Sequence, residues 1–205
     1  GLNGSYTNTI HDNFGDGADA LVLGLPPQEA YSQIEALFIG YYGRAADPAG
    51  MTQYAQHILG DLESGQTLEE AILHISQDFA SSEENAPYNQ LATQPLDPNN
   101  DPTQVALATS FIEQTYQYLF NRSPDYATTE FWLAELFNGA IPYSELVYTI
   151  ESTANATDRI PLNFKIDAAA YFTQNLAASG GETPSKSAMT DAVTGVIDNS
   201  TMLMS

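Results

Sequence analysis

Two of the five Lys and Arg residues in this 205-residue chain lie in the same short context, and their type and spacing could bind an anion. Arg44 precedes Asp47 by three residues in "YYGRAADPAG", and Arg122 precedes Asp125 by three in "LFNRSPDYAT". A guanidinium can bind a carboxylate, phosphate or sugar acid through two hydrogen bonds. It can also bind the carbonyls at the end of one helix and the carboxylate that caps the next. Neither context contains a second cation, so we interpret both pairs as structural clamps of a turn.

Acidic residues at the spacing of calcium ligands form a second candidate site. "DPNND" has the first, third and fifth positions of an EF-hand loop, but Pro102 and Ala108 stand where that loop requires Gly and Glu. "FGDGADALV" matches one calcium-binding RTX nonapeptide except at its first residue, and a single copy cannot complete a site that successive turns share. A loosely held calcium ion and plain solvated turns are the two alternatives. The candidate ligands are Asp12, Asp16, Asp19, Asp97, Asn99 and Asp101.

Composition excludes several other kinds of chemistry. The chain has no cysteine, which rules out disulfides, thiol catalysis and cysteine-based metal sites. It contains no Gly-x-Ser-x-Gly nucleophile elbow and no Gly-rich phosphate loop. Carboxylates are so numerous that no pair can be singled out as a glycosidase couple from the sequence. We therefore expect a protein that is not an enzyme, with no cofactor other than calcium.

The charge of the chain restricts its partners. With 26 acidic residues against five Lys and Arg, the formal net charge is −21. Such a field repels nucleic acid and anionic membranes, and it favours divalent cations, cationic partners or a saline exterior. No apolar run is long enough to span a bilayer, so we expect neither nucleic-acid binding nor membrane insertion.

The elements that must position these residues are helices. Apolar residues recur at spacings of three and four, and no alternating run is long enough to indicate a strand. Asp47-Pro48 and Asp101-Pro102 are typical helix starts, and Thr67 with Glu70 has the spacing of a capping box. The predicted class is all-α. We divide the chain into an extended lead-in (1–27), a first helical repeat (28–85), a Pro-rich linker (86–102), a second repeat (103–160) and C-terminal helices packed on the repeats (161–205).

The two repeats are related by a shift of 78 residues. This shift aligns "IEALFIGYYGRAADPAGMTQY" with "IEQTYQYLFNRSPDYATTEFW", so that Arg44 meets Arg122 and Asp47 meets Asp125. Aromatic residues coincide as well, including Tyr54 with Trp132, the single tryptophan. We interpret the pattern as an internal duplication of a helical unit that packs into a bundle.

These motifs resemble a bacterial extracellular helical repeat domain of unknown function, family 4214, found in surface-layer proteins and in RTX-type proteins exported by type I secretion. The resemblance lies in the aromatic pair followed by Gly or Asn, then Arg, two residues and Asp, with an aromatic in the next helix. "NFKIDAAAYFTQNL" and "AMTDAVTGVIDNSTML" are similar to the segments that follow in that family, so the similarity covers roughly residues 30 to 200. The second repeat departs from the pattern, with Tyr126 where Pro is usual and Thr128 where Gly is usual.

The resemblance implies a secreted or cell-surface location and a role in binding and assembly. The family offers no catalytic residues to carry over, and in its surface-layer members a region of this kind anchors the lattice to lipopolysaccharide. We therefore expect a surface-layer or secreted module that binds cell-surface glycan through calcium, because an anionic protein and an anionic glycan need divalent ions between them. Two alternatives stay open. One is a structural subunit of a filament or lattice that contacts only other copies of itself, and the other is an accessory domain of a secreted enzyme.

Overall fold

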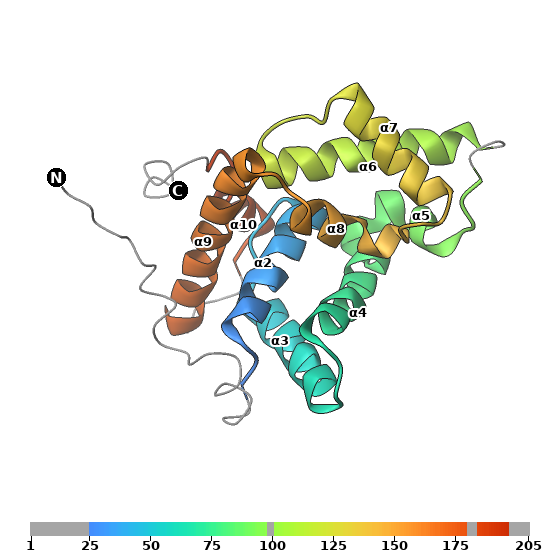
Figure 1. Cartoon of the computed structure of the whole chain (residues 1–205). Coiled ribbons are helices and arrows are strands. Elements are labelled where there is room, and N and C mark those ends of the chain that lie inside the picture. The colour runs from blue at the N-terminus through green and yellow to red at the C-terminus, as the bar shows by residue number, and fades with distance from the viewer. Residues whose placement is uncertain (1–24, 98–100, 180–183, 197–205) are drawn as a thin grey trace.

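The computed structural model describes residues 25–97, 101–179 and 184–196, and every regular element in these ranges is a helix. The predicted all-α class is thus confirmed (Figure 1). Residues 1–24 of the predicted lead-in lie outside the described ranges. The α-helices are α2 (Gln28–Tyr42), α3 (Pro48–Glu63), α4 (Leu68–Ser81), α5 (Asn89–Thr93), α6 (Pro102–Phe120), α7 (Tyr126–Phe137), α8 (Leu146–Ser152), α9 (Ala156–Ser179) and α10 (Lys186–Asp191), and the 3₁₀ helices are η2 (Glu83–Tyr88) and η3 (Tyr143–Glu145).

Local capping explains where the principal helices begin. Asp47 accepts a hydrogen bond from the Gly50 amide at the start of α3, where Pro48 occupies the first helical position. Thr67 and Glu70 form the predicted capping box of α4. Asp101 caps α6 in the same way as Asp47 caps α3, again before a proline. These starts confirm the helix boundaries that the sequence predicts at the three positions.

The core is built around α2, which packs against α4, α6, α8 and α9. Aromatic rings from different elements contact one another within it. The ring centroids of Phe38 and Phe79 are 4.8 Å apart, and those of Phe111 and Tyr143 are also 4.8 Å apart. Tyr41 bridges the two pairs, since its ring centroid lies 5.8 Å from that of Phe79 and 5.7 Å from that of Phe111. Aromatic contacts of this kind join both repeats in one core.

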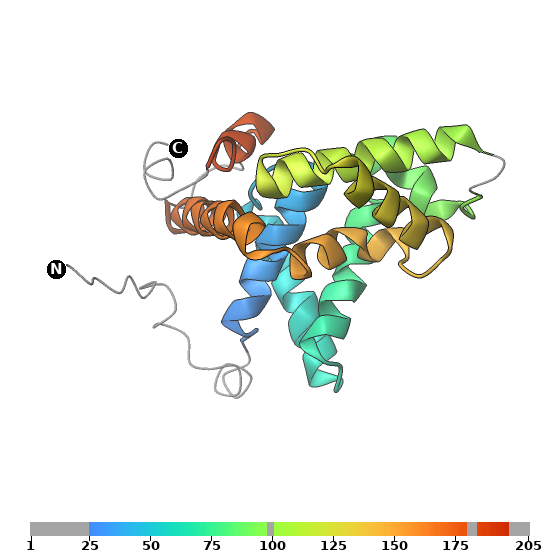
Figure 2. The same cartoon turned by 45° about the horizontal axis from the view of Figure 1, so that its top comes forward.

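Helix α9 closes the bundle. It runs alongside α2 and also contacts α3 and α6, so it covers parts of both repeats (Figures 1 and 2). The predicted boundary between residues 160 and 161 falls inside this continuous helix. Among the described residues, no helix combines the length and the apolar character that crossing a bilayer requires.

The predicted linker at 86–102 is partly helical in the structure. Its first residues belong to η2 and α5, although Pro87 removes a backbone donor there. Tertiary contacts compensate for that loss. The side-chain amide of Asn85 donates to the Ala80 carbonyl and to the Tyr143 hydroxyl, both at 2.8 Å, and Leu91 is buried. Buried contacts therefore outweigh the local effect of the proline.

Candidate functional site

Arg44 binds a carboxylate that lies 40 residues further along the chain. Its Nε and Nη2 donate to the two carboxylate oxygens of Glu84, each at 2.8 Å. Its Nη1 donates to the carbonyl of Ala45 at 2.9 Å, and the guanidinium lies over the Phe38 ring, 4.7 Å from its centroid. Asp47 is a more distant partner, with 3.7 Å between its Oδ2 and Nη1. Arg44 thus ties the turn after α2 to the helix that follows α4.

Arg122 reproduces this arrangement in the second repeat. Its Nε and Nη2 donate to the two carboxylate oxygens of Asp158 at 2.7 and 2.6 Å. Its Nη1 donates to the carbonyl of Ser123 at 3.1 Å, and the guanidinium lies 5.1 Å from the centroid of the Tyr116 ring. Asp158 belongs to the first turn of α9, as Glu84 belongs to the first turn of η2. The structure therefore duplicates the arginine contacts as well as the sequence around them.

The sequence predicts a clamp from four residues, and the structure gives them two different tasks. Asp47 and Asp125 cap α3 and α7, Asp125 by accepting from the Thr128 amide at 2.8 Å. The paired hydrogen bonds of the arginines go instead to Glu84 and Asp158, which the sequence reasoning missed. One signal for these partners was present, because each is an acidic residue just after a capping residue, Ser82 or Asn155.

The two arginine pairs differ in burial. The Arg44 side chain is 7% exposed, whereas that of Arg122 is 42% exposed. Burial by itself would raise the pKa of Glu84, but the hydrogen bonds and charge of Arg44 outweigh it, and the pKa lies below its ordinary value. Lys186 also approaches Glu84, with 3.4 Å between its Nζ and Oε1. The first clamp is therefore the less hydrated of the two.

A buried carboxylate supports the first turn from the other side. Glu35 of α2 is fully buried, and its Oε2 accepts from the Ala46 amide at 2.9 Å. The Thr173 hydroxyl of α9 lies 2.7 Å from the other oxygen of Glu35 and 2.9 Å from the Ala46 carbonyl. One hydroxyl proton can serve only one of these oxygens at a time. If Glu35 is protonated it donates to Thr173, and Thr173 then donates to Ala46, so every group is satisfied.

Burial and this hydrogen-bond arrangement favour the neutral form of Glu35. Desolvation raises the pKa of Glu35 to about 7, although the hydrogen bonds from Ala46 and Thr173 and the charge of Arg44 oppose it. The equivalent residue of the second repeat, Glu113, is exposed. The difference follows from α9, which supplies Thr173 next to Glu35. A short carboxylate network of this kind stabilises the turn and does not reach solvent.

Lys165 of α9 is another buried titratable side chain at the repeats. Its Nζ donates to the carbonyl of Tyr118 in the last turn of α6, where helix carbonyls lack partners and the helix dipole is negative. Desolvation lowers its pKa to about 8. It lies beside a cavity of about 400 Å³ that Gly43 and Tyr118 also line. We interpret its contact as the C-terminal cap of α6.

All five Lys and Arg residues of the chain are described, and each contacts a carbonyl or carboxylate of the protein itself. None is therefore an unengaged cation on the surface, and the remaining surface charge is acidic. The pairs are Arg44 with Glu84, Arg122 with Asp158, Arg159 with the carbonyls of Ser152 and Ala154, Lys165 with the carbonyl of Tyr118, and Lys186 with Glu84.

The candidate calcium ligands are only partly within the described ranges. Asp101 accepts hydrogen bonds from the amides of Thr103 and Gln104 and thus caps α6. Asp97 lies nearby, and its amide donates to the side chain of Gln104 at 2.9 Å. The described part of the chain contains no group of three or more His, Asp or Glu side chains that could hold a metal ion. Four candidates lie outside the described residues, namely Asp12, Asp16, Asp19 and Asn99.

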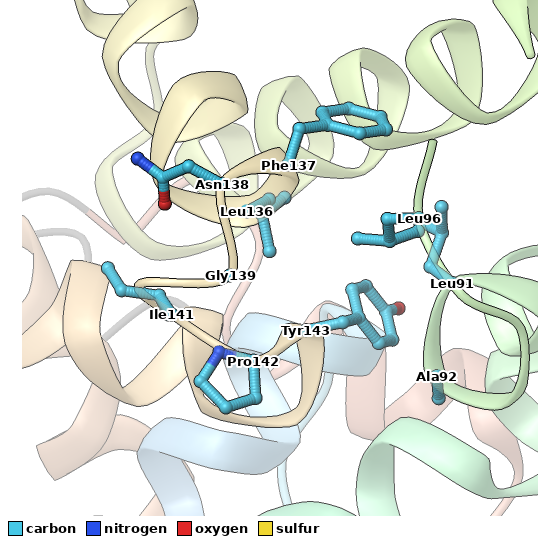
Figure 3. A pocket seen from close by; sticks show the side chains of 10 residues that line it. All are labelled: Leu91, Ala92, Leu96, Leu136, Phe137, Asn138, Gly139, Ile141, Pro142 and Tyr143. Carbon is cyan, nitrogen blue, oxygen red and sulfur yellow. The ribbon is translucent and has the colours of Figure 1, made fainter. Parts of the chain in front are cut away.

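Two further cavities lie at the helix surfaces. One of about 370 Å³ lies between α2, α3 and α9, and Glu35 forms part of its wall without any exposed area. The other, also of about 370 Å³, is mainly apolar and lies where α7 meets the segment after α5 (Figure 3). Leu96, Leu136 and Tyr143 point toward one another around it (Figure 3). The first cavity is lined by Glu35 and Thr173, which are hydrogen-bonded to each other, whereas the second has no Asp, Glu or His among the residues that line it.

Comparison with known families identifies the second repeat. Residues 103–159 match the family described as Domain of unknown function (DUF4214), which confirms the resemblance over that segment. The matched segment is similar to that domain. It runs from α6 into the first turn of α9 and so includes Arg122, Asp125 and Asp158. No curated protein and no solved structure matches the chain.

Proposed function

We propose that the chain is a non-catalytic binding and assembly module of a secreted or surface-layer protein. The observation that carries this proposal is the engagement of all five cations with the protein's own carbonyls and carboxylates. The arginines of the repeated motif hold turns together in both repeats, and their guanidiniums bind the protein's own carboxylates. What remains for partners is a surface whose charge is acidic.

An acidic surface of this kind can approach an anionic glycan only through divalent cations. The proposed partner is therefore cell-surface glycan, in particular lipopolysaccharide, bound through calcium. Asp97 and Asp101 are the two residues of the candidate calcium segment whose carboxylates lie in the described part of the chain. Calcium accepts carboxylate and amide oxygens in flexible geometry, and the site forms as the ion binds.

The test is binding of the purified chain to lipopolysaccharide isolated from the producing bacterium, first with calcium and then with a chelator. Saturable binding that disappears on chelation is the expected result. An Asp97→Asn/Asp101→Asn variant sharpens the test, because Asn still caps a helix while the charge is removed. This variant should bind with lower calcium affinity. Binding that is absent in both conditions would contradict the glycan role.

A second candidate function is assembly through protein contacts alone. The observation in its favour is the exposure of large apolar side chains on α7, Tyr126 and Phe131. Monomeric proteins seldom gather such residues on one exposed helix face unless another molecule covers it. Sedimentation of the chain with calcium and without glycan separates this candidate from the first, because only protein contacts would then increase the sedimenting mass.

A further inference from the structure

The outer face of α7 has an unusual composition for a solvent-exposed helix. Five exposed residues form it at spacings of one, three and four. Tyr126 is 80% exposed and Phe131 is 53% exposed. Only one of the five residues carries a charge. They are Tyr126, Ala127, Glu130, Phe131 and Ala134, and we call them the α7 face.

The first repeat provides an internal comparison for this face. Helix α3 begins 78 residues before α7 and occupies the same position after its arginine turn. At the positions equivalent to Glu130, Phe131 and Ala134 it carries Thr52, Gln53 and Gln56, which are also exposed. The same structural position is therefore polar in the first repeat and aromatic in the second. Water is the natural neighbour of the α3 residues, whereas the α7 face leaves an aromatic surface uncovered.

The inner side of α7 is apolar as well. Trp132 and Leu136 are buried there, and Leu133 and Phe137 are half-buried. A helix that is apolar on nearly all sides is ordinarily enclosed by other elements. Yet α7 packs mainly on α6 and lies at the edge of the molecule (Figure 1). A cavity of about 370 Å³ lies beside Phe137 at the C-terminal end of this helix (Figure 3).

The charges around the α7 face indicate what kind of partner would cover it. Asp125 precedes the face, Glu130 lies within it and Glu135 follows it, so all three nearby charges on the helix are negative. The one arginine close by, Arg122, is bound to Asp158. A second copy of this chain could not supply matching cations, because its five Lys and Arg residues are already engaged and its net charge is −21.

We propose that the α7 face docks a helix of a different protein, one with an apolar stripe flanked by Lys and Arg. Phe131 and Tyr126 pack into the stripe, and the two alanines allow the helices to approach closely. Glu130 and Glu135 meet the basic residues at the edge of the contact, which speeds the encounter and selects the partner. This inference rests on the proposed binding and assembly role and specifies one surface for it.

A labelled synthetic helix of leucine and lysine, with leucine at helical spacing, is a suitable probe for the full chain. Fluorescence anisotropy of the peptide label measures its affinity, which should fall as salt is raised. Phe131→Gln/Ala134→Gln gives α7 the residues of α3 and should weaken binding roughly tenfold or more. Gln53→Ala/Gln56→Ala changes the equivalent positions of α3 and should leave the affinity unchanged.

A charge reversal keeps the test independent of packing. Glu130→Lys alters an exposed side chain only. It should weaken binding of the leucine–lysine peptide and strengthen binding of a leucine–glutamate peptide of the same spacing. Equal binding of the leucine–lysine peptide by the chain and by the Phe131→Gln/Ala134→Gln variant would overturn the proposal. So would a dimer of the chain that the same variant abolishes, since the partner would then be a second copy.

The same variants separate this inference from the proposed function. Calcium-dependent binding of lipopolysaccharide should survive in Phe131→Gln/Ala134→Gln, because neither residue is a candidate ligand or lines the cavity where the end of α7 meets Leu96. If the peptide fails to bind while glycan binding persists, only the α7 inference falls. If both fail, the binding role itself is contradicted.

Discussion

Arg44 and Arg122 hold their carboxylates with the same paired hydrogen bonds in two different environments. The Arg44 side chain, bound to Glu84, is 7% exposed, and the Arg122 side chain, bound to Asp158, is 42% exposed. Both guanidiniums also lie over an aromatic ring at the equivalent position, Phe38 or Tyr116. The two arginine–carboxylate pairs thus make the same contacts, but they differ in how far water can reach them.

Removing the two guanidiniums should therefore have unequal costs. Arg44→Met should lower the free energy of unfolding by about 3 kcal/mol, because it leaves Glu84 without its main partner in a poorly hydrated place. Arg122→Met should cost about 1 kcal/mol, since water can replace much of an exposed pair. Urea unfolding of both variants measures the difference. Equal costs would show that burial does not set the strength of the clamp.

A double-mutant cycle provides the control for this prediction. Combining Arg44→Met with Glu84→Gln, and Arg122→Met with Asp158→Asn, isolates the energy of each pair from the loss of other contacts. The coupling energy should be larger for Arg44 and Glu84.

Glu35 should make the stability of the protein depend on pH in a direction opposite to that of a salt-bridged carboxylate. Its pKa in the folded state is raised to about 7 from an ordinary value of 4.5, so the folded state holds the extra proton between these values. Its contribution is fully present at low pH and is lost as pH rises through 7. Relative to Glu35→Gln, the protein should lose about 3 kcal/mol across this range. Unfolding curves from pH 4.5 to 8 measure the difference.

Glu113→Gln is the matched control for Glu35→Gln. The two glutamates are equivalent in the repeats, but Glu113 is exposed. Its replacement should leave the pH dependence of unfolding nearly unchanged. If Glu35→Gln behaves like Glu113→Gln, the buried carboxylate is ionised in the folded state at neutral pH.

Lys165 should produce a pH dependence of the reverse sign at alkaline pH. Burial lowers its pKa to about 8 from 10.5, so the unfolded state binds more protons between these values and stability rises with pH. Lys165→Met removes the charge and keeps the apolar stem. The stability of the protein relative to this variant should rise by about 1–2 kcal/mol above pH 8, measured below the range in which tyrosines ionise.

Replacing Gly43 by a residue with a side chain should destabilise the protein, whereas the equivalent position of the second repeat already carries the side chain of Asn121. Gly43 ends α2 with φ +66°, and a Cβ there would lie 2.6 Å from the Tyr118 ring. Its equivalent, Asn121, ends α6 with φ 56° and tolerates its side chain. Gly43→Asn accepts the left-handed conformation, so its cost, about 2 kcal/mol, isolates the collision with Tyr118. Thermal unfolding checks this result, and Tyr118→Ala should relieve the cost.

Much of the architecture follows from local sequence signals. The three capped starts at Asp47, Thr67 and Asp101 arise from residues within a few positions of one another, and these the sequence predicts correctly. The 78-residue shift likewise predicts two equivalent arginine turns, because equivalent residues meet equivalent neighbours. The helices at 86–93 were missed, since the buried contacts of Asn85 and Leu91 with distant residues outweigh the local effect of Pro87.

The clamp partners and the state of Glu35 depend on contacts over long stretches of chain. Glu84 and Asp158 lie 40 and 36 residues from their arginines, and the three-residue spacing pointed to Asp47 and Asp125 instead. Glu35 and Glu113 cannot be distinguished by their local sequence. One is buried because α9 places Thr173 beside it, 138 residues further along the chain.

The position of α9 also orders events during synthesis. The first repeat requires a side chain of α9 to complete its turn, yet Thr173 emerges from the ribosome 138 residues after Glu35. Translation of the intervening segment takes on the order of ten seconds. During that interval the Ala46 carbonyl and Glu35 lack their Thr173 partner, and the turn after α2 is completed only when α9 arrives.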